Sequence, residues 1–197
     1  MNNAMTSASR YLTRFIARSI AFIGAGIATP LVANAASAQS CPADGNAAPA
    51  ALHREWILKG WEKHHGDPLF DFGKKLGHFY DWSGETLILY DDMAPDHEVA
   101  HSAERYGELF TPLFRQQREV RHAVIDGPDA IVDGRLAVST LEFAARLVGP
   151  DGTVMGIRDR STLTWRCRDD GWKIVREHNS SHGVSREEID RLVPHEN

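Results

Sequence analysis

The chain has 197 residues, of which 42% are hydrophobic, 9% aromatic and 25% charged. This composition is typical of one globular domain with a hydrophobic core, and it excludes a disordered or fibrous chain. The formal net charge is −5, and the 22 basic and 27 acidic residues are mixed along the chain. Because no basic stripe is available to neutralise phosphates, the sequence argues against a nucleic-acid partner.

Residues 1–38 are predicted to be a secretory signal peptide. Arginines and no acids occur in residues 1–18, an apolar run follows over residues 20–28, and residues 36–38 read Ala-Ser-Ala, an A-x-A cleavage site. A membrane anchor is the alternative, but the run is shorter than the roughly 20 residues a bilayer needs, and Pro30 follows it. We therefore expect cleavage after residue 38, no stable membrane anchor afterwards, and a periplasmic or secreted protein.

Residues 39–51 are rich in Ala, Pro, Gly and Asn and are predicted to be a flexible leader. This leader contains Cys41, and the other cysteine of the chain is Cys167. In an oxidising compartment the two could form a bridge that stabilises the fold by about 4 kcal/mol in the chain-entropy model. A buried free thiol at Cys167, with Cys41 loose in the leader, is an equally open alternative.

Apolar residues recur at helical spacing in three segments, 52–65, 69–80 and 98–116. A short strand, 86–90, is predicted between the second and the third. Pro112 argues for a kink or an early end in the third helix.

Strands dominate the rest of the chain, at 118–125, 135–148, 153–167 and 171–180, and the last two junctions carry tight hairpin signals. A C-terminal tail, 183–197, is predicted to hold a short helix that starts at the capping box Ser185-Arg-Glu-Glu. Helices followed by antiparallel strands predict an α+β domain, in which a curved sheet packs against three N-terminal helices.

The segment from Arg160 to Ser180 resembles the closing hairpin of SnoaL-like domains in the nuclear transport factor 2-like superfamily, which includes ketosteroid isomerase. Its recurring elements are an Arg-x-Thr strand, a Gly-Trp-Lys-Ile-Val turn and strand, and a terminal His-x-Ser. The order of elements agrees as well, so the resemblance covers residues 52–182. It implies a cone-shaped mixed sheet around one cavity for a small, partly apolar molecule, and a homodimer through the outer sheet face. Proton-transfer chemistry of isomerase, dehydratase or cyclase type, or a noncatalytic dimerisation or partner-binding role, would each be compatible with such a domain.

Candidate ligand-binding residues come from the late strands and from Tyr90 on the first strand. A period of two places His178 and Ser180 on the face of Trp172 and Ile174, which is expected to point inward. A core histidine held by a backbone carbonyl is the alternative for His178.

Arg160 is a second candidate. The resemblance suggests that it enters the cavity, where a guanidinium could bind a carboxylate or enolate oxygen. Pairing with Glu142 on the adjacent strand is an equal alternative.

The candidate catalytic residue is Asp92, or Asp91 if the register slips. The resemblance implies a proton-shuttling carboxylate at the end of the first strand, where burial could raise its pKa. The acids that would hold an oxyanion do not carry over from the family, which makes steroid isomerisation doubtful. The alternative is that both aspartates lie in a turn and cap the next helix, without a catalytic role.

His97-Glu98-Val-Ala-His101 matches the His-Glu-x-x-His pattern, which on a helix binds zinc. Pro95 and Asp96 place the motif at a helix start, and no third ligand is evident, so a zinc hydrolase is only a remote alternative. No cofactor is expected, since the sequence has no Gly-rich phosphate loop.

Overall fold

The structure is a computed structural model that describes residues 41–83 and 87–194. The predicted signal peptide lies outside the described residues. No helix among the described residues is long and apolar enough to cross a bilayer.

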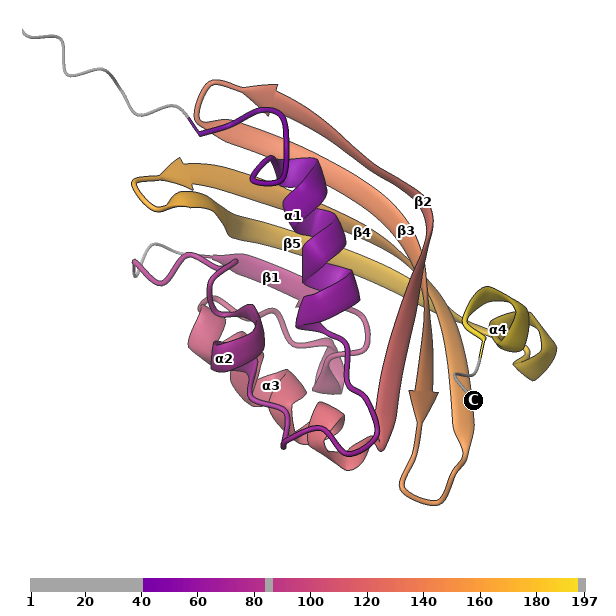
Figure 1. The fold of residues 1–197 in the computed structure, drawn as a ribbon. Coiled ribbons are helices and arrows are strands. Elements are labelled where there is room, and N and C mark those ends of the chain that lie inside the picture. The colour runs from indigo at the N-terminus through magenta and orange to yellow at the C-terminus, as the bar shows by residue number, and fades with distance from the viewer. Residues whose placement is uncertain (1–40, 84–86, 195–197) are drawn as a thin grey trace, which may run out of the picture. The chain divides into compact units, whose positions relative to one another are not determined.

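One five-stranded sheet forms the centre of the domain, in the order β1-β5-β4-β3-β2 (Figure 1). Its strands are β1 (Ile88–Asp91), β2 (Glu119–Asp133), β3 (Leu136–Val148), β4 (Val154–Arg168) and β5 (Gly171–Val184). β1 runs parallel to β5, and the other neighbours are antiparallel. The predicted α+β fold with a curved, mixed sheet and N-terminal helices is confirmed.

The helix boundaries differ from those that periodicity predicted. α1 (Pro49–Glu55) continues into a π-helical turn, Trp56–Gly60, while α2 covers only Phe72–Leu76 and α3 covers Ala103–Gln116. α1 starts inside the predicted leader because proline is well suited to the first helical turn. α3 starts late because Ser102 caps it, its Oγ accepting from the Arg105 N–H at 3.1 Å.

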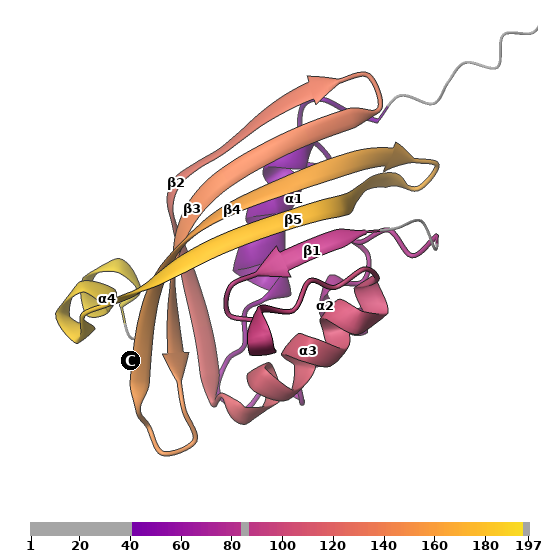
Figure 2. The same cartoon turned by 180° about the vertical axis from the view of Figure 1, so that it is seen from behind.

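α1 crosses the inner face of the sheet, as the two opposite views show (Figure 1, Figure 2). His53, fully buried on this helix, makes a hydrogen bond of 2.9 Å from Nδ1 to Ser139 Oγ and one of 3.0 Å from Nε2 to Ser161 Oγ. Trp165 Nε1 also donates to Ser139 Oγ at 2.7 Å. Burial lowers the pKa of His53 to about 3, so the ring is neutral at physiological pH. This network fixes the helix to β3 and β4.

A β-bulge interrupts the pairing of β4 with β5. Trp165 lies opposite Ile174, and the preceding Thr164 lies opposite Arg176, which leaves Val175 as an extra residue. One additional residue exchanges the two faces of a strand beyond it, because side chains alternate with a period of two.

The bulge decides which β5 side chains are buried. Before it, Trp172 and Ile174 belong to the core, whereas after it Glu177 and Asn179 are buried and His178 is exposed. The prediction that His178 shares the face of Trp172 is therefore wrong, since the simple alternation breaks at the bulge.

The C-terminal helix α4 (Arg186–Leu192) packs on the outer face of the sheet, away from α1 (Figure 2). Ser185 Oγ accepts from the Glu188 N–H at 3.1 Å, as the predicted cap requires. Ile189 lies so close to Gly156 that a Cβ there would come within 2.6 Å of the Ile189 Cβ. The buried Arg146 guanidinium binds Asp190 of this helix. α4 therefore covers one end of the outer face.

Cys41 and Cys167 form a disulfide with a Cα–Cα distance of 5.7 Å. Beside it, Trp172 Nε1 donates to the Pro42 carbonyl at 2.8 Å. Of the two alternatives left open for the cysteines, the structure has the bridge. It fastens the start of the predicted leader to the sheet.

Candidate ligand cavity

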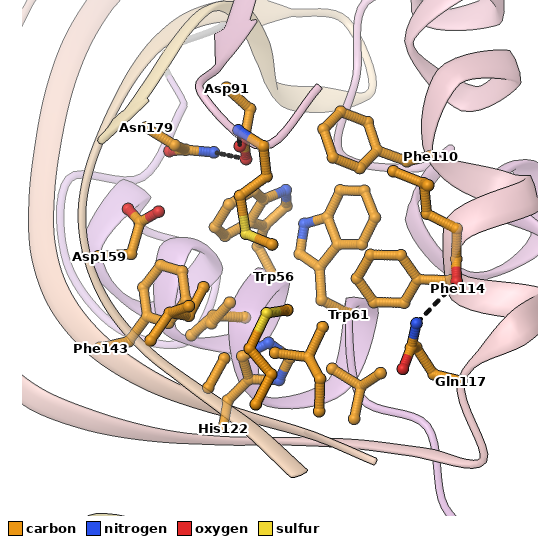
Figure 3. A pocket seen from close by; sticks show the side chains of 18 residues that line it. Trp56, Trp61, Asp91, Phe110, Phe114, Gln117, His122, Phe143, Asp159 and Asn179 are labelled. Carbon is orange, nitrogen blue, oxygen red and sulfur yellow. Dashed lines mark hydrogen bonds between the residues drawn. The ribbon is translucent and has the colours of Figure 1, made fainter. Parts of the chain in front are cut away.

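A cavity of about 220 Å³ lies between the inner face of the sheet and the helices (Figure 3). Its wall is mainly aromatic and aliphatic, and the aromatic side chains are Trp56, Trp61, Phe110, Phe114 and Phe143. Trp61 lies at the centre of this cluster, with its ring centroid 4.8 Å from that of Phe114 and 5.6 Å from that of Phe110. Such a wall favours a flat apolar body.

Polar groups gather on one side of the cavity, where Asp91, Asp159 and Asn179 lie across from Trp61 and Phe114 (Figure 3). They come from three adjacent strands, β1, β4 and β5. The sheet therefore places two carboxyl groups and an amide around one end of an otherwise apolar space.

A chain of hydrogen bonds leads from this end into the core. Asn179 Nδ2 donates to Asp91 Oδ2 at 3.0 Å and to Glu177 Oε1 at 2.8 Å. Glu177 also accepts from the hydroxyls of Tyr106 at 2.5 Å and Tyr80 at 2.7 Å. Trp56 Nε1 donates to the Tyr80 hydroxyl at 3.0 Å. Asn179 is thereby held in one orientation, with its carbonyl oxygen left over.

Two buried acceptors in this wall have no hydrogen-bond partner, namely Asp159 Oδ1 and Asn179 Oδ1. Asp159 is 2% exposed and Asn179 is 1% exposed. A buried acceptor without a donor costs about 1–3 kcal/mol, so these atoms are suited to meet a donor on a bound molecule. Trp61 Nε1, another atom of the cavity wall, is a buried donor without a partner.

Burial raises the pKa of the Asp159 carboxyl to about 8, and the nearby charges of Asp91, Asp92 and Glu177 add to this effect. Burial also raises the pKa of Asp91, although hydrogen bonds from Asn179 and the Met93 N–H oppose it. Asp159 therefore carries a proton at neutral pH. Two carboxyl groups with raised pKa values beside a cavity are typical of general acid–base sites.

Burial raises the pKa of Glu177 to about 8 as well, against the hydrogen bonds from Tyr106, Tyr80 and Asn179. This third acid does not line the cavity but lies behind Asn179. Three acids, Asp91, Asp159 and Glu177, therefore lie at or directly behind the polar end of the cavity.

On the opposite wall, His122 is the other titratable side chain that lines the cavity. Its backbone N–H donates to Glu62 Oε1 at 2.6 Å, and its Nδ1 lies 3.4 Å from the same oxygen. Arg121 Nε contacts the other Glu62 oxygen at 2.9 Å. Glu62 therefore interacts with residues of β2 and does not belong to the acidic end of the cavity.

Residues 88–183 match the family model described as a SnoaL-like domain, which includes β1, α3 and the four long strands. Residues 88–183 therefore form a SnoaL-like domain.

One solved structure with a similar fold has a TM-score above 0.5. A Xanthomonas campestris protein provisionally assigned as a calcium/calmodulin dependent protein kinase II association domain is 19% identical, with a TM-score of 0.51, over 73% of this chain and 93% of that chain. A superfamily protein from Salmonella enterica serovar Typhimurium is 21% identical over 55% of this chain and 75% of its own, with a TM-score of 0.45. No curated protein matches the chain. At these identities the likeness concerns the fold alone.

The SnoaL-like domain holds Asp91, rather than Asp92, at the cavity. Asp92 accepts from the Ser181 backbone N–H at 2.7 Å and from the Ser181 hydroxyl at 2.8 Å, so it is fixed to the end of β5. The other possibility stated for this strand, a register one residue earlier, matches the geometry. Neither aspartate caps α3, whose cap is Ser102.

The predicted ligand-binding residues lie together, but on the outer face of the sheet. Tyr90 pairs in register with His178, their rings 5.2 Å apart and edge to face, and His178 pairs with Thr162. In the next row Glu142 pairs with Arg160, and Arg160 with Ser180. None of these predicted residues lines the cavity.

Arg160 points outward because it alternates with Asp159 and Ser161, both buried on the inner face. Its side chain is 84% exposed, and its Nε lies 3.6 Å from Glu142 Oε2. Arg158 binds the same glutamate through its guanidinium. Pairing with Glu142, one of the two alternatives for Arg160, is what the structure has.

The His-Glu-x-x-His motif does not lie on a helix. Residues 95–97 form a 3-10 turn, and Ala100 forms a bridge with Leu89 of β1. His101 Nδ1 is 3.1 Å from the Leu87 carbonyl, and Glu98 forms an ion pair with Arg105 at 2.7 Å. Across the described residues, no three His, Cys, Asp or Glu side chains are grouped to hold a metal ion.

Three residues of the acidic end, Asp159, Glu177 and Asn179, were absent from the sequence prediction. Asp159 could have been found, because a period of two places it on the same strand face as the apolar residues Ile157 and Leu163. Glu177 and Asn179 could not, since only the bulge at Val175 turns them inward.

Proposed function

We propose that this chain is an exported SnoaL-like protein that binds a small, partly apolar molecule and catalyses proton transfer with Asp91 and Asp159. The observation that carries the proposal is a pair of carboxyl groups at one end of an aromatic cavity, Asp159 buried and Asp91 half-buried, both with raised pKa values. The reaction class is isomerisation, dehydration or cyclisation, each of which needs one group to remove a proton and another to supply one.

In this mechanism Asp91, as a carboxylate, accepts a proton from the bound molecule. Asp159, protonated at neutral pH, donates its proton to the atom where negative charge develops. Asn179 is a positioning residue, because its amide fixes Asp91 by the 3.0 Å hydrogen bond. The aromatic wall keeps the carboxyl groups away from water, which is what raises their pKa values.

Proton transfer can be tested by isotope exchange. Small cyclic ketones incubated with the protein in D₂O should take up deuterium next to the carbonyl, as measured by NMR. Asp91→Asn should lower the exchange rate by about a hundredfold or more and Asp159→Asn by about tenfold to a hundredfold, the usual range for a general acid or base. The matched control is Asp133→Asn, an exposed aspartate at the end of β2.

Substitutions that block or leave open the cavity provide a second control. Met155 lines the cavity but is 46% exposed, so Met155→Trp should narrow the space without disturbing the core, whereas Met155→Leu should leave it open. Exchange that survives in both aspartate variants and in Met155→Trp would refute catalysis in this cavity.

Export to the periplasm or outside the cell is part of the proposal. Its support is the basic and apolar character of residues 1–38, together with a disulfide, which forms and persists in oxidising compartments. Cell fractionation followed by N-terminal sequencing should give a mature chain that begins at Gln39. An intact N-terminus in the cytosol would contradict this part.

We further propose that two copies pair through the uncovered part of the outer sheet face. One row across the strands there places Ile131, Val138 and Ile88 at exposed positions, with exposed fractions of 78%, 42% and 41%. Thr164 and Arg176 lie between Val138 and Ile88 in this row. Exposed apolar side chains on a sheet favour association. Light scattering should give a dimer mass, and Val138→Arg should give a monomer; a wild-type monomer at micromolar concentration would exclude the pairing.

A further inference from the structure

We propose that the cavity takes a small organic cation, an ammonium group on a flat apolar body, with the charged nitrogen at Asp159 and Asn179. This inference rests on the proposed binding function and specifies a ligand class for it; an ammonium group that ionises Asp159 leaves no proton there to donate, so such a molecule is a bound ligand and not the substrate of the proton transfer. Its basis is the arrangement of three features around one cavity: buried acceptors without a hydrogen-bond partner, acids without a lysine or arginine partner among the described residues, and aromatic rings (Figure 3).

The unpartnered acceptors call for hydrogen-bond donors. Asp159 Oδ1 and Asn179 Oδ1 are both buried in the same wall, and neither receives a hydrogen bond. Asn179 cannot turn its amide to change this, because its Nδ2 is held by Asp91 and Glu177. An ammonium group carries several N–H donors and no acceptor, which suits two such oxygens.

The charges around Asp159 point to the same class. The groups that face it are Asp91 and Asp92 from the end of β1, and Glu177 from β5, all of them acids. In the described part of the chain no lysine or arginine forms an ion pair with any of these acids, and none lines the cavity. A carboxylate or phosphate placed at this end would be repelled by the neighbouring carboxylates, whereas a cation would be attracted to them.

The rest of the cavity suits the remainder of such a ligand. Trp61, Phe110 and Phe114 face the acidic end from the opposite side. Aromatic faces attract cations as well as apolar groups, so they tolerate a charged nitrogen at the boundary between the two ends. Met93 and Met155 also line the space and can adapt to the shape of an apolar body.

The test uses matched pairs of probes that differ only in the charged group. Binding of 2-phenylethylamine, 2-phenylethanol and phenylacetate to the whole purified chain is measured by calorimetry, and tryptamine is compared with tryptophol in the same way. We expect each amine to bind at least about tenfold more tightly than its alcohol, and phenylacetate to bind most weakly.

A second readout identifies the acidic end as the place of binding. Asp159 carries a proton at neutral pH, so a bound ammonium group should displace it, and about one proton should be released per amine at pH 7. Calorimetry in buffers of different ionisation enthalpy measures this number. Asp159→Asn should abolish the release and reduce the preference for amine over alcohol to about twofold or less.

The outcomes separate this inference from the proposed function. If alcohols bind as tightly as amines, and Met155→Trp blocks both, the cavity binds small molecules but the cation assignment is wrong. If no probe binds at millimolar concentration, the cation assignment is overturned while deuterium exchange remains the independent test of catalysis. Amine binding that persists unchanged in Asp159→Asn would also overturn the assignment.

Discussion

Asn179 Nδ2 on β5 lies 3.0 Å from Asp91 Oδ2 on β1, and these two strands pair in parallel at one edge of the sheet. The same amide nitrogen donates to Glu177 at 2.8 Å, so one neutral residue connects the buried Glu177 with the half-buried Asp91. This arrangement controls both the orientation of Asp91 and the charge that the acidic end can carry.

Replacing Asn179 with alanine should therefore destabilise the protein. The change removes two hydrogen bonds to buried carboxyl groups, and we expect the free energy of unfolding to fall by about 3 kcal/mol. Urea denaturation at neutral pH measures the loss. Asn46→Ala, at an exposed position before α1, is the control and should have no measurable effect. A loss as small as that of the control would show that Asn179 does not organise the acidic end.

The stability of the protein should depend on Asp159 between about pH 4 and pH 8. Burial raises the folded-state pKa of Asp159 from 3.8 to about 8, so the folded chain holds a proton that the unfolded chain has lost. Stability must then fall as the pH rises through this interval, by up to about 1.4 kcal/mol per pH unit.

Asp159→Asn tests this dependence, since the amide cannot ionise. Denaturation at several pH values should show a shallower decline in the variant, and the variant should be more stable than the wild type near pH 8. Equal slopes in the two proteins would mean that Asp159 is ionised in the folded state throughout.

His53 should impose the opposite dependence at low pH. Burial lowers its folded-state pKa from 6.5 to about 3, so the unfolded chain binds a proton that the folded chain excludes. Stability is lost as the pH falls below 6.5, and a maximum is expected between the two effects. His53→Gln should flatten the acid limb, measured by thermal unfolding, while His182→Gln at an exposed site should not.

Reduction of the Cys41–Cys167 bridge should lower stability by about 2–5 kcal/mol, because it closes a loop with a sequence separation of 126. The double variant Cys41→Ser, Cys167→Ser should match the reduced wild type in denaturant titrations. Probe binding in the cavity should remain, since neither cysteine lines it. An unchanged denaturation midpoint after reduction would contradict a stabilising role.

The fold was predictable from sequence because its signals are local and repeated. Helical spacing, tight hairpin residues and the motif from Arg160 to Ser180 all agree with a SnoaL-like domain. Cap positions such as Ser102 and Asp71 were missed because periodicity finds the centre of a helix better than its ends.

The candidate site was less predictable, because one residue decides it. Counting by two from Trp172 leads to His178, whereas the structure buries Glu177 and Asn179 after the extra residue Val175. A bulge depends on how two strands pair, and this pairing is not visible in either strand alone. Of the two alternatives for Arg160, the cavity is excluded for a different reason, since Arg160 alternates on β4 with the buried Asp159 and Ser161 and therefore faces outward.

The bulge also means that β5 contains two different linings for the same cavity. If β5 paired with β4 without the bulge, the strand would turn over from that point, withdraw Glu177 and Asn179, and present His178 and Ser180 to the interior. The cavity would then be lined by an imidazole and a hydroxyl in place of the acid and the amide on β5, and the charge of the molecules that it binds would change accordingly. A shift of one residue in the pairing of these two strands would thus change the ligand class without any substitution in the wall.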